Sequence, residues 1–173
     1  MRLQSILNTA GAGILAFAML ALPVHLTAQS AGTVLKAADA QKLLPSAVYY
    51  KAQSASTQLR NSGGIKFADG YYLLSTLVDT SGYSSDVASK YQAYFITEVP
   101  IKIGGKSLPA GVYGIGFIAG NKFIVTDVGA HEVLTVTYAT DEAIKRPMPL
   151  EVLADPAGGF RLYEGRKYVH ISR

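Results

Sequence analysis

Turn signals at short and regular intervals constrain the fold of this chain more than any other feature. Clusters of glycine, proline, asparagine and aspartate stand at residues 61–64, 69–70, 104–105, 109–111, 120–121 and 156–159. The runs between them are short and rich in β-branched and aromatic residues, which favour strands. Strands do not alternate with helices in the way that builds a parallel sheet. We therefore predict a mostly β fold, an antiparallel β-sandwich or barrel of about eight or nine strands with a short N-terminal helix.

The local pattern predicts several individual elements. Residues 31–45 have the leucine spacing of a short helix that ends at Pro45. Residues 54–70 are polar and rich in turn formers, and within them Asp69-Gly70 predicts a hairpin if residues 65–68 form a strand. One helical turn is expected within residues 85–91. Residues 93–103 are expected to form one long strand, with Pro100 at an edge or a bulge.

The N-terminal residues have the layout of a secretory signal peptide. Arg2 supplies a positive start, residues 10–22 form an apolar stretch, and Pro23 precedes a zone of small residues. We predict a signal peptide over residues 1–28, a helical segment over 29–46 and a single β domain over 47–173. The alternative is an uncleaved anchor, although a membrane span usually needs about 20 apolar residues. The chain is thus expected to be exported to the periplasm or the extracellular space, without a stable membrane span after cleavage.

Composition excludes several classes of function. The chain has no cysteine, so a disulfide, a thiolate nucleophile, a thiolate metal site and a lipid anchor on cysteine are all excluded. Its formal net charge of +4 is small and interspersed, which is unlike the basic footprint of a nucleic-acid-binding protein. Hydrophobic residues make up 49% of the chain, enough to stabilise a fold without disulfides.

The glycine-spaced stretch GVYGIGFIAG raises the question of a phosphate cradle. A dinucleotide fingerprint needs a different glycine spacing and a following helix, whereas the residues after Gly120 continue as a strand. Read as a strand, Tyr113 lies on one face with Ile115 and Phe117, and Gly114 and Gly116 leave a shallow groove on the other. We expect a core aromatic such as Tyr138 or Phe95 to fill this groove. The alternative is a ligand groove at Tyr113, Gly114 and Gly116.

The same stretch carries a resemblance to known families. Residues 103–117, IGGKSLPAGVYGIGF, resemble the Leu-Pro-Ala-Gly-x-Tyr hairpin of small secreted β-sandwich modules, transthyretin-like and carboxypeptidase-regulatory-like domains among them. They are also similar to a hairpin of uncharacterised exported bacterial proteins. The resemblance implies a β-sandwich-like, non-catalytic module in which Pro-Ala-Gly makes the turn and the tyrosine begins an inward-facing strand. It covers about fifteen residues and carries over no functional residue.

The candidates for catalysis and metal binding surround one histidine. Asp127, His131 and Glu132 place two carboxylates near an imidazole, and His170 is a possible fourth group from the last strand. The helical H-E-x-x-H motif of zinc enzymes is absent, and so is the G-x-S-x-G nucleophile elbow. We expect His131 to lie on the surface or to cap a loop, and the alternative is a metal-binding or catalytic histidine. We predict neither a metal nor a cofactor.

Two further patterns suggest binding surfaces. Neighbours in a strand point to opposite faces, so one member of Tyr49-Tyr50 and of Tyr71-Tyr72 is expected to be exposed. Tyr50 and Tyr72 are the candidates for stacking on a sugar or aromatic ligand, and the alternative is that these tyrosines only cover a sheet. The C-terminal segment concentrates basic charge, either for an anionic partner or to protect a terminal edge strand. Its basic residues are Arg161, Arg166, Lys167, His170 and Arg173.

Three functions remain open from these residues. The first is a non-enzymatic binding or interaction module for a glycan, a small molecule or a protein. The second is a small hydrolase or isomerase that uses His131 with Asp127 or Glu132. The third is a structural subunit that assembles through its strand edges.

Overall fold

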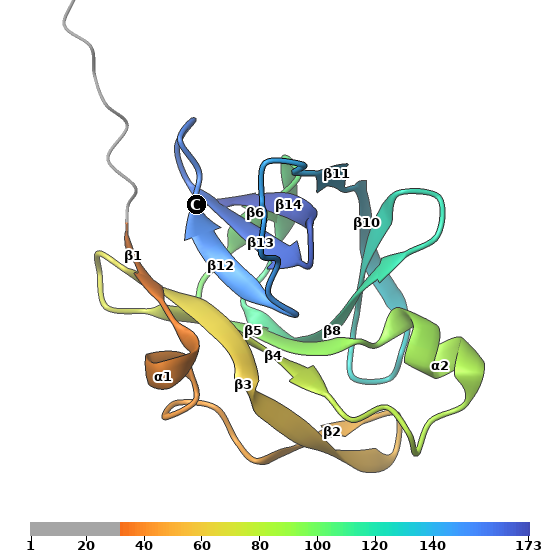
Figure 1. Ribbon diagram of the computed structural model, residues 1–173. Helices are drawn as coiled ribbons and strands as arrows, with labels where there is room; N and C mark the ends of the chain where they lie inside the picture. The colour runs from red at the N-terminus through yellow and green to blue at the C-terminus, as the bar shows by residue number, and fades with distance from the viewer. Residues whose placement is uncertain (1–31) are drawn as a thin grey trace, which may run out of the picture.

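The computed structural model describes residues 32–173, which form two antiparallel β-sheets packed face to face (Figure 1). The larger sheet has the strand order β1-β3-β4-β5-β8-β9-β10, and β2 pairs with β3 at its end. Its strands are β1 Gly32–Leu35, β2 Ala47–Tyr50, β3 Gln53–Phe67, β4 Tyr72–Val78, β5 Ala93–Thr97, β8 Gly111–Ile118, β9 Lys122–Thr126 and β10 Glu132–Thr137.

The second sheet has the order β12-β13-β14-β6-β7, with β11 paired to β14. Its strands are β6 Ile101–Ile103, β7 Lys106–Leu108, β11 Ala139–Thr140, β12 Glu151–Ala154, β13 Phe160–Glu164 and β14 Lys167–Ser172. Two short helices, α1 (Ala37–Ala40) and α2 (Ser85–Lys90), lie on the face of the larger sheet that points away from the second one (Figure 1). The predicted β fold is confirmed, and the architecture is a sandwich rather than a barrel.

The main core lies between the two sheets. Alternate residues of each strand point inward, as the burial pattern of β5 illustrates, with Phe95 fully buried between two half-buried neighbours. Ile115 and Phe123 of the larger sheet meet Leu162 and Ile171 of the second sheet in the same cluster. Among residues 32–173, no helix has both the length and the apolar character needed to cross a membrane.

The prediction of one strand over residues 93–103 is wrong. The chain forms β5 in the larger sheet, leaves it at Thr97, and enters the second sheet as β6 at Ile101. Pro100 lies in this crossing. Because proline has no N–H to donate to a strand ladder, it suits a segment that passes between sheets.

The N-terminal segment differs from the predicted helix over residues 29–46. Gly32–Leu35 pairs with β3 as strand β1, with Gly32 opposite Phe67 and Leu35 opposite Gly64, and only α1 is helical. The β-branched pair Thr33-Val34 favours this strand. The predicted signal peptide over residues 1–28 lies outside the described residues.

Most of the turn-rich segment predicted over residues 54–70 is instead part of β3, a strand of 15 residues. Its glycines have a packing role: a Cβ on Gly63 would lie 3.1 Å from the backbone nitrogen of Val152, so this glycine lets β12 approach. The hairpin predicted at Asp69-Gly70 is confirmed between β3 and β4, with Gly70 at a φ of 92°. The helical turn predicted within residues 85–91 is confirmed as α2.

Candidate functional site

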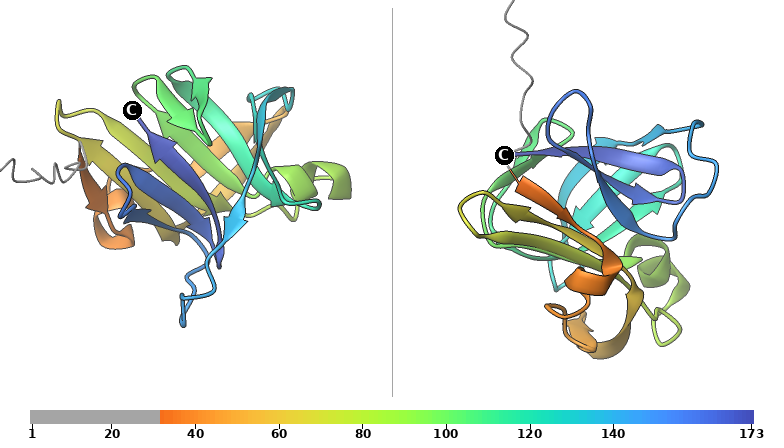
Figure 2. Two further views of the ribbon diagram at one scale, coloured as in Figure 1. Left: turned by 90° about the horizontal axis from the view of Figure 1, so that it is seen from above. Right: turned by 60° about the vertical axis from the view of Figure 1, so that its left-hand side comes forward.

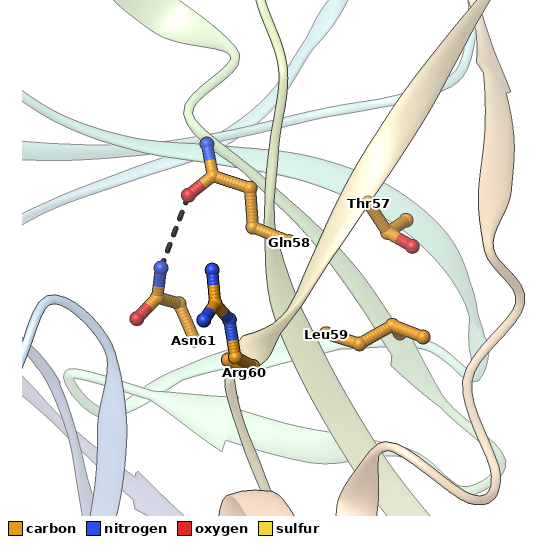
Figure 3. A pocket seen from close by; sticks show the side chains of 5 residues that line it. All are labelled: Thr57, Gln58, Leu59, Arg60 and Asn61. Atoms are coloured by element: carbon orange, nitrogen blue, oxygen red, sulfur yellow. Dashed lines mark hydrogen bonds between the residues drawn. The ribbon is translucent and has the colours of Figure 1, made fainter.

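A large β-bulge interrupts the pairing of β3 with β4. Gln58 pairs with Leu77 and Ser62 pairs with Thr76, so residues 59–61 have no partner on β4. Side chains of β3 itself hold the bulge. The Ser62 hydroxyl donates to the carbonyl of Leu59 at 2.7 Å. The Asn61 amide donates to Oε1 of Gln58 at 3.0 Å, as Figure 3 shows. Bulges are frequent next to functional sites because they redirect a side chain.

The bulge places Arg60 on the side of β3 opposite to Leu59. In Figure 3, Gln58, Arg60 and Asn61 lie on one side of the strand, and Thr57 and Leu59 lie on the other. Leu59 packs with the apolar cluster below α1. A surface hollow of about 470 Å³ is lined by these five residues, Thr57 to Asn61. Among residues 32–173, the exposed Arg60 side chain has no hydrogen bond or ion pair.

Arg60 also lines a second hollow of about 300 Å³, which we call the β1–β12 cavity. β12, an edge strand of the second sheet, packs against β1 and β3 (Figure 2). The cavity is lined by residues of this junction. Its apolar lining is Val34, Leu35, Ala37, Ala38, Met148, Leu150, Val152 and Leu153. Its other lining residues are Lys36, Arg60, Ser62, Gly63 and Glu151. Apolar walls with a few polar groups are typical of small-molecule sites.

The charges of the β1–β12 cavity are not balanced. Burial raises the pKa of Glu151, and the positive charge of Lys36 acts in the opposite direction. Among residues 32–173 no ion pair joins these two side chains, so the lining holds two cations, Lys36 and Arg60, against one carboxylate. Arg60 is the guanidinium of this lining, and it has no acidic partner among residues 32–173.

The predicted catalytic group centres on Asp127, which binds its own loop. Its Oδ1 accepts the backbone N–H groups of Gly129 and His131, each at 2.9 Å, and its Oδ2 lies 3.0 Å from Nδ1 of His131. The backbone bond from His131, followed by the bond from the imidazole, lowers the pKa of Asp127. The His131 side chain is 81% exposed. This arrangement matches the expected exposed histidine of a capped loop.

The remaining members of that predicted group point elsewhere. Glu132 accepts a hydrogen bond from the Thr135 hydroxyl at 2.6 Å, within β10. His170 lies on β14, where its Nε2 is 2.8 Å from the carbonyl oxygen of Gly158. Within residues 32–173, no three His, Asp or Glu side chains come together as metal ligands.

The groove over the strand glycines is filled by this chain. Tyr113 points into the core between the sheets, as the alternation of β8 predicts. A Cβ on Gly114 would lie 2.5 Å from the Tyr91 ring and 2.8 Å from the Tyr50 ring, and one on Gly116 would meet the backbone of Lys90. Aromatic side chains thus cover part of the groove, but they come from β2 and the end of α2. The expected Tyr138 and Phe95 do not fill it, because both pack in the core between the sheets.

One member of each tyrosine pair is exposed, as strand geometry predicts. Tyr49 is 62% exposed and Tyr71 is exposed by half, whereas Tyr50 is buried. Tyr50 is therefore not an open stacking platform. Tyr72 is half-buried against the α1 cluster, with Nζ of Lys66 5.8 Å from its ring centroid.

The C-terminal basic residues do not protect an edge. β14 lies inside the second sheet, between β13 and β6. Two of these basic residues also have acidic partners within the chain. Nε of Arg161 on β13 lies 2.8 Å from Oδ2 of Asp155, and Nζ of Lys167 on β14 lies 3.3 Å from Oε2 of Glu164. The edge-protection hypothesis for this segment is wrong.

Sequence reasoning missed the β1–β12 cavity. The available signal was the glycine pair Gly63-Gly64, because glycines inside a strand mark a bulge or a close backbone approach. Val34 and Val152 meet only through the tertiary fold, and no local pattern joins them. Comparison with protein-family models, with curated proteins and with solved structures found no match to this chain.

Proposed function

We propose that this protein is an exported, non-enzymatic binding module that takes a small ligand into the β1–β12 cavity. The cavity itself carries the proposal, since its volume of about 300 Å³ and its mostly apolar lining suit a small organic molecule. Met148 is 48% exposed at this lining, which leaves an apolar side chain accessible to a ligand.

The arrangement of the polar groups favours binding over catalysis. Both oxygens of the Asp127 carboxylate are engaged by its own loop, and His131 stands in solvent, where water competes for its partners. Glu132 bonds within its strand. These contacts stabilise the turn at residues 127–131, and this structural role accounts for the positions of Asp127 and His131 without a substrate.

Export is supported by the sequence pattern. Residues 1–28 combine a positive start, an apolar stretch and a small-residue zone, and the chain is free of cysteine. A protein in the periplasm or outside the cell then depends on its apolar core for stability, and the two packed sheets supply one. The sequence has no nucleotide-binding motif, and the cavity can hold a small ligand. Both features are consistent with a binding module in a compartment that lacks ATP.

A native mass spectrum of the protein purified from the export pathway, recorded beside its denatured mass, tests the proposal. We expect a retained organic ligand, and a denatured mass that corresponds to cleavage near Ala28. The variant Met148→Trp should lower ligand occupancy by filling the cavity mouth. Leu43→Trp is the matched control, because Leu43 is 49% exposed and lies outside the cavity lining.

Two results would overturn the binding function. One is a ligand-free native spectrum together with no change in the amide NMR spectrum of β1 and β12 on addition of a metabolite extract. The other is a retained ligand whose occupancy is equal in Met148→Trp and Leu43→Trp. Concentration-dependent assembly of the ligand-free protein would favour the structural-subunit function instead.

A further inference from the structure

We propose that the β1–β12 cavity selects a small organic carboxylate with an apolar body, and that Arg60 is the residue that binds the carboxylate. This inference rests on the proposed binding function and specifies its ligand class. It combines three observations: the guanidinium of Arg60 is unpaired among residues 32–173, the cavity walls are apolar, and the bulge places Arg60 beside those walls.

The charge of the lining favours a monoanion. The lining holds two cations, Lys36 and Arg60, and one carboxylate, Glu151, which leaves one net positive charge. Arg60 has no acidic partner among residues 32–173. One uncompensated positive charge on the lining is complementary to one negative charge on the ligand.

The chemistry of the guanidinium favours a carboxylate as that anion. A guanidinium presents parallel N–H donors in a planar fork that matches the two oxygens of a carboxylate. The two exposed carboxylates closest in sequence have other partners, since Asp69 pairs with Arg173 and Asp79 accepts a hydrogen bond from the backbone N–H of Ser81. Arg60 is thus available to a carboxylate that the chain does not itself supply.

The apolar lining favours a ligand with a hydrocarbon or aromatic body. Val34 and Leu35 of β1 face Leu150 and Val152 around β12, and Met148 adds an adaptable side chain. Burying an apolar body there contributes about 25 cal/mol for each Å² removed from water. A fully polar anion such as inorganic phosphate would leave these walls unused.

The bulge gives Arg60 its place, at a cost to the sheet. Residues 59–61 give up their ladder partners on β4, and the Asn61–Gln58 and Ser62–Leu59 hydrogen bonds hold the resulting conformation. Gly63, two residues after the bulge, lets β12 close over the same region. A costly irregularity that ends in an unpaired cation beside an apolar cavity is typical of a binding site.

The test is an NMR titration of the exported protein with three matched probes: octanoate, 1-octanol and octylammonium. We expect octanoate to shift the amide signals of β1, of residues 60–63 and of β12, with an affinity about tenfold or more above that of octanol. Octylammonium should bind more weakly than octanol. Arg60→Gln should reduce octanoate affinity about tenfold and leave octanol affinity unchanged.

Lys66→Gln is the control, because Lys66 is an exposed cation on the same strand that does not line the cavity. It should leave octanoate affinity unchanged, and both variants should melt within a few degrees of the wild type. Equal affinities for octanoate and octanol, or tighter binding of octylammonium, would overturn the carboxylate inference but leave the binding function standing. No shift with any probe would also overturn it, and the native mass spectrum would then decide the binding function separately.

Discussion

Tyr50 and Tyr91 lie face to face on the outer side of the larger sheet, with ring centroids 3.7 Å apart and planes at 10°. Tyr83 stands edge-on to both rings. The Tyr50 hydroxyl lies 2.7 Å from the hydroxyl of Thr126, and that threonine donates to the carbonyl of Gly114. These contacts fasten β2 and the end of α2 to the sheet. They also explain why β8 carries a glycine at position 114.

Gly114→Ala should therefore destabilise the protein. The added methyl group would overlap both stacked rings, and overpacking of this kind costs about 1–3 kcal/mol in unfolding free energy. Gly82→Ala is the control, since a Cβ at Gly82 meets only Oε1 of Gln53 at 3.7 Å. Urea unfolding of the two variants measures the difference. Equal unfolding free energies for both variants would contradict this prediction, because the Tyr50 and Tyr91 rings would then make room for the methyl group without loss of stability.

Much of the fold can be predicted from local sequence. Asp69-Gly70 marks a hairpin because both residues adopt turn conformations readily, and the alternation of β8 assigns Tyr113 to the core. The break at Pro100 cannot be assigned in this way. A missing N–H fits an edge, a bulge or a crossing equally well, and only the second sheet decides between them.

The candidate site is harder to predict because its parts are distant in the chain. Arg60 reads as one more polar residue in a turn-rich segment, and the bulge that redirects it exists only once β3 pairs with β4. The opposite wall, Leu150 and Val152, comes from β12 and the residue before it. Tyr50 and Tyr91, which fill the groove at Gly114, are likewise brought there by tertiary packing. The hydrophobic periodicity of their own segments does not predict this contact.

Asp155 contributes to stability through Arg161, and this contribution should disappear in acid. The Asp155 carboxylate is 6% exposed and accepts two bonds from the guanidinium, at 2.8 and 3.0 Å, which lower its pKa. A lowered pKa in the folded state gives stability above the ordinary aspartate pKa, and that stability is lost as the pH falls through the lowered value. Asp155→Asn should cost about 1–3 kcal/mol at pH 7.

Unfolding free energies of the wild type and Asp155→Asn, measured from neutral to acidic pH, should converge as the pH falls. Asp39→Asn is the control, because the Asp39–Lys42 pair is exposed on α1 and the following turn and contributes less than about 1 kcal/mol. A constant difference between wild type and Asp155→Asn over the whole range would contradict the role of the ion pair.

Asp127 and His131 should differ in their effect on stability. Asp127→Ala removes two backbone hydrogen bonds and the imidazole contact, so the Tm should fall by a few degrees. His131→Ala removes one exposed contact, and the Tm should stay within about a degree of the wild type. Thermal melting monitored by circular dichroism makes the comparison. A larger loss for His131→Ala would contradict a loop held by the carboxylate.

Glu164 should make the protein less stable as the pH rises. This side chain, 25% exposed, points between the sheets near Leu77, Phe117 and Leu150, and burial raises its pKa against the lowering effect of Lys167. The folded state therefore holds the Glu164 proton more tightly than the unfolded chain does. Where the folded state binds more protons, unfolding free energy decreases with increasing pH, here from the ordinary glutamate pKa up through the raised one.

Glu164→Gln should remove this decrease, because the amide is neutral at every pH. Above the raised pKa the variant should unfold at higher urea concentration than the wild type, by a free energy on the order of 1 kcal/mol. Below the ordinary glutamate range the two proteins should be equally stable. Glu142→Gln, at an exposed position in the connection to β12, should follow the wild type throughout. A Glu164→Gln variant less stable than the wild type at pH 8 would mean that the ion pair with Lys167 outweighs the cost of burying the charge.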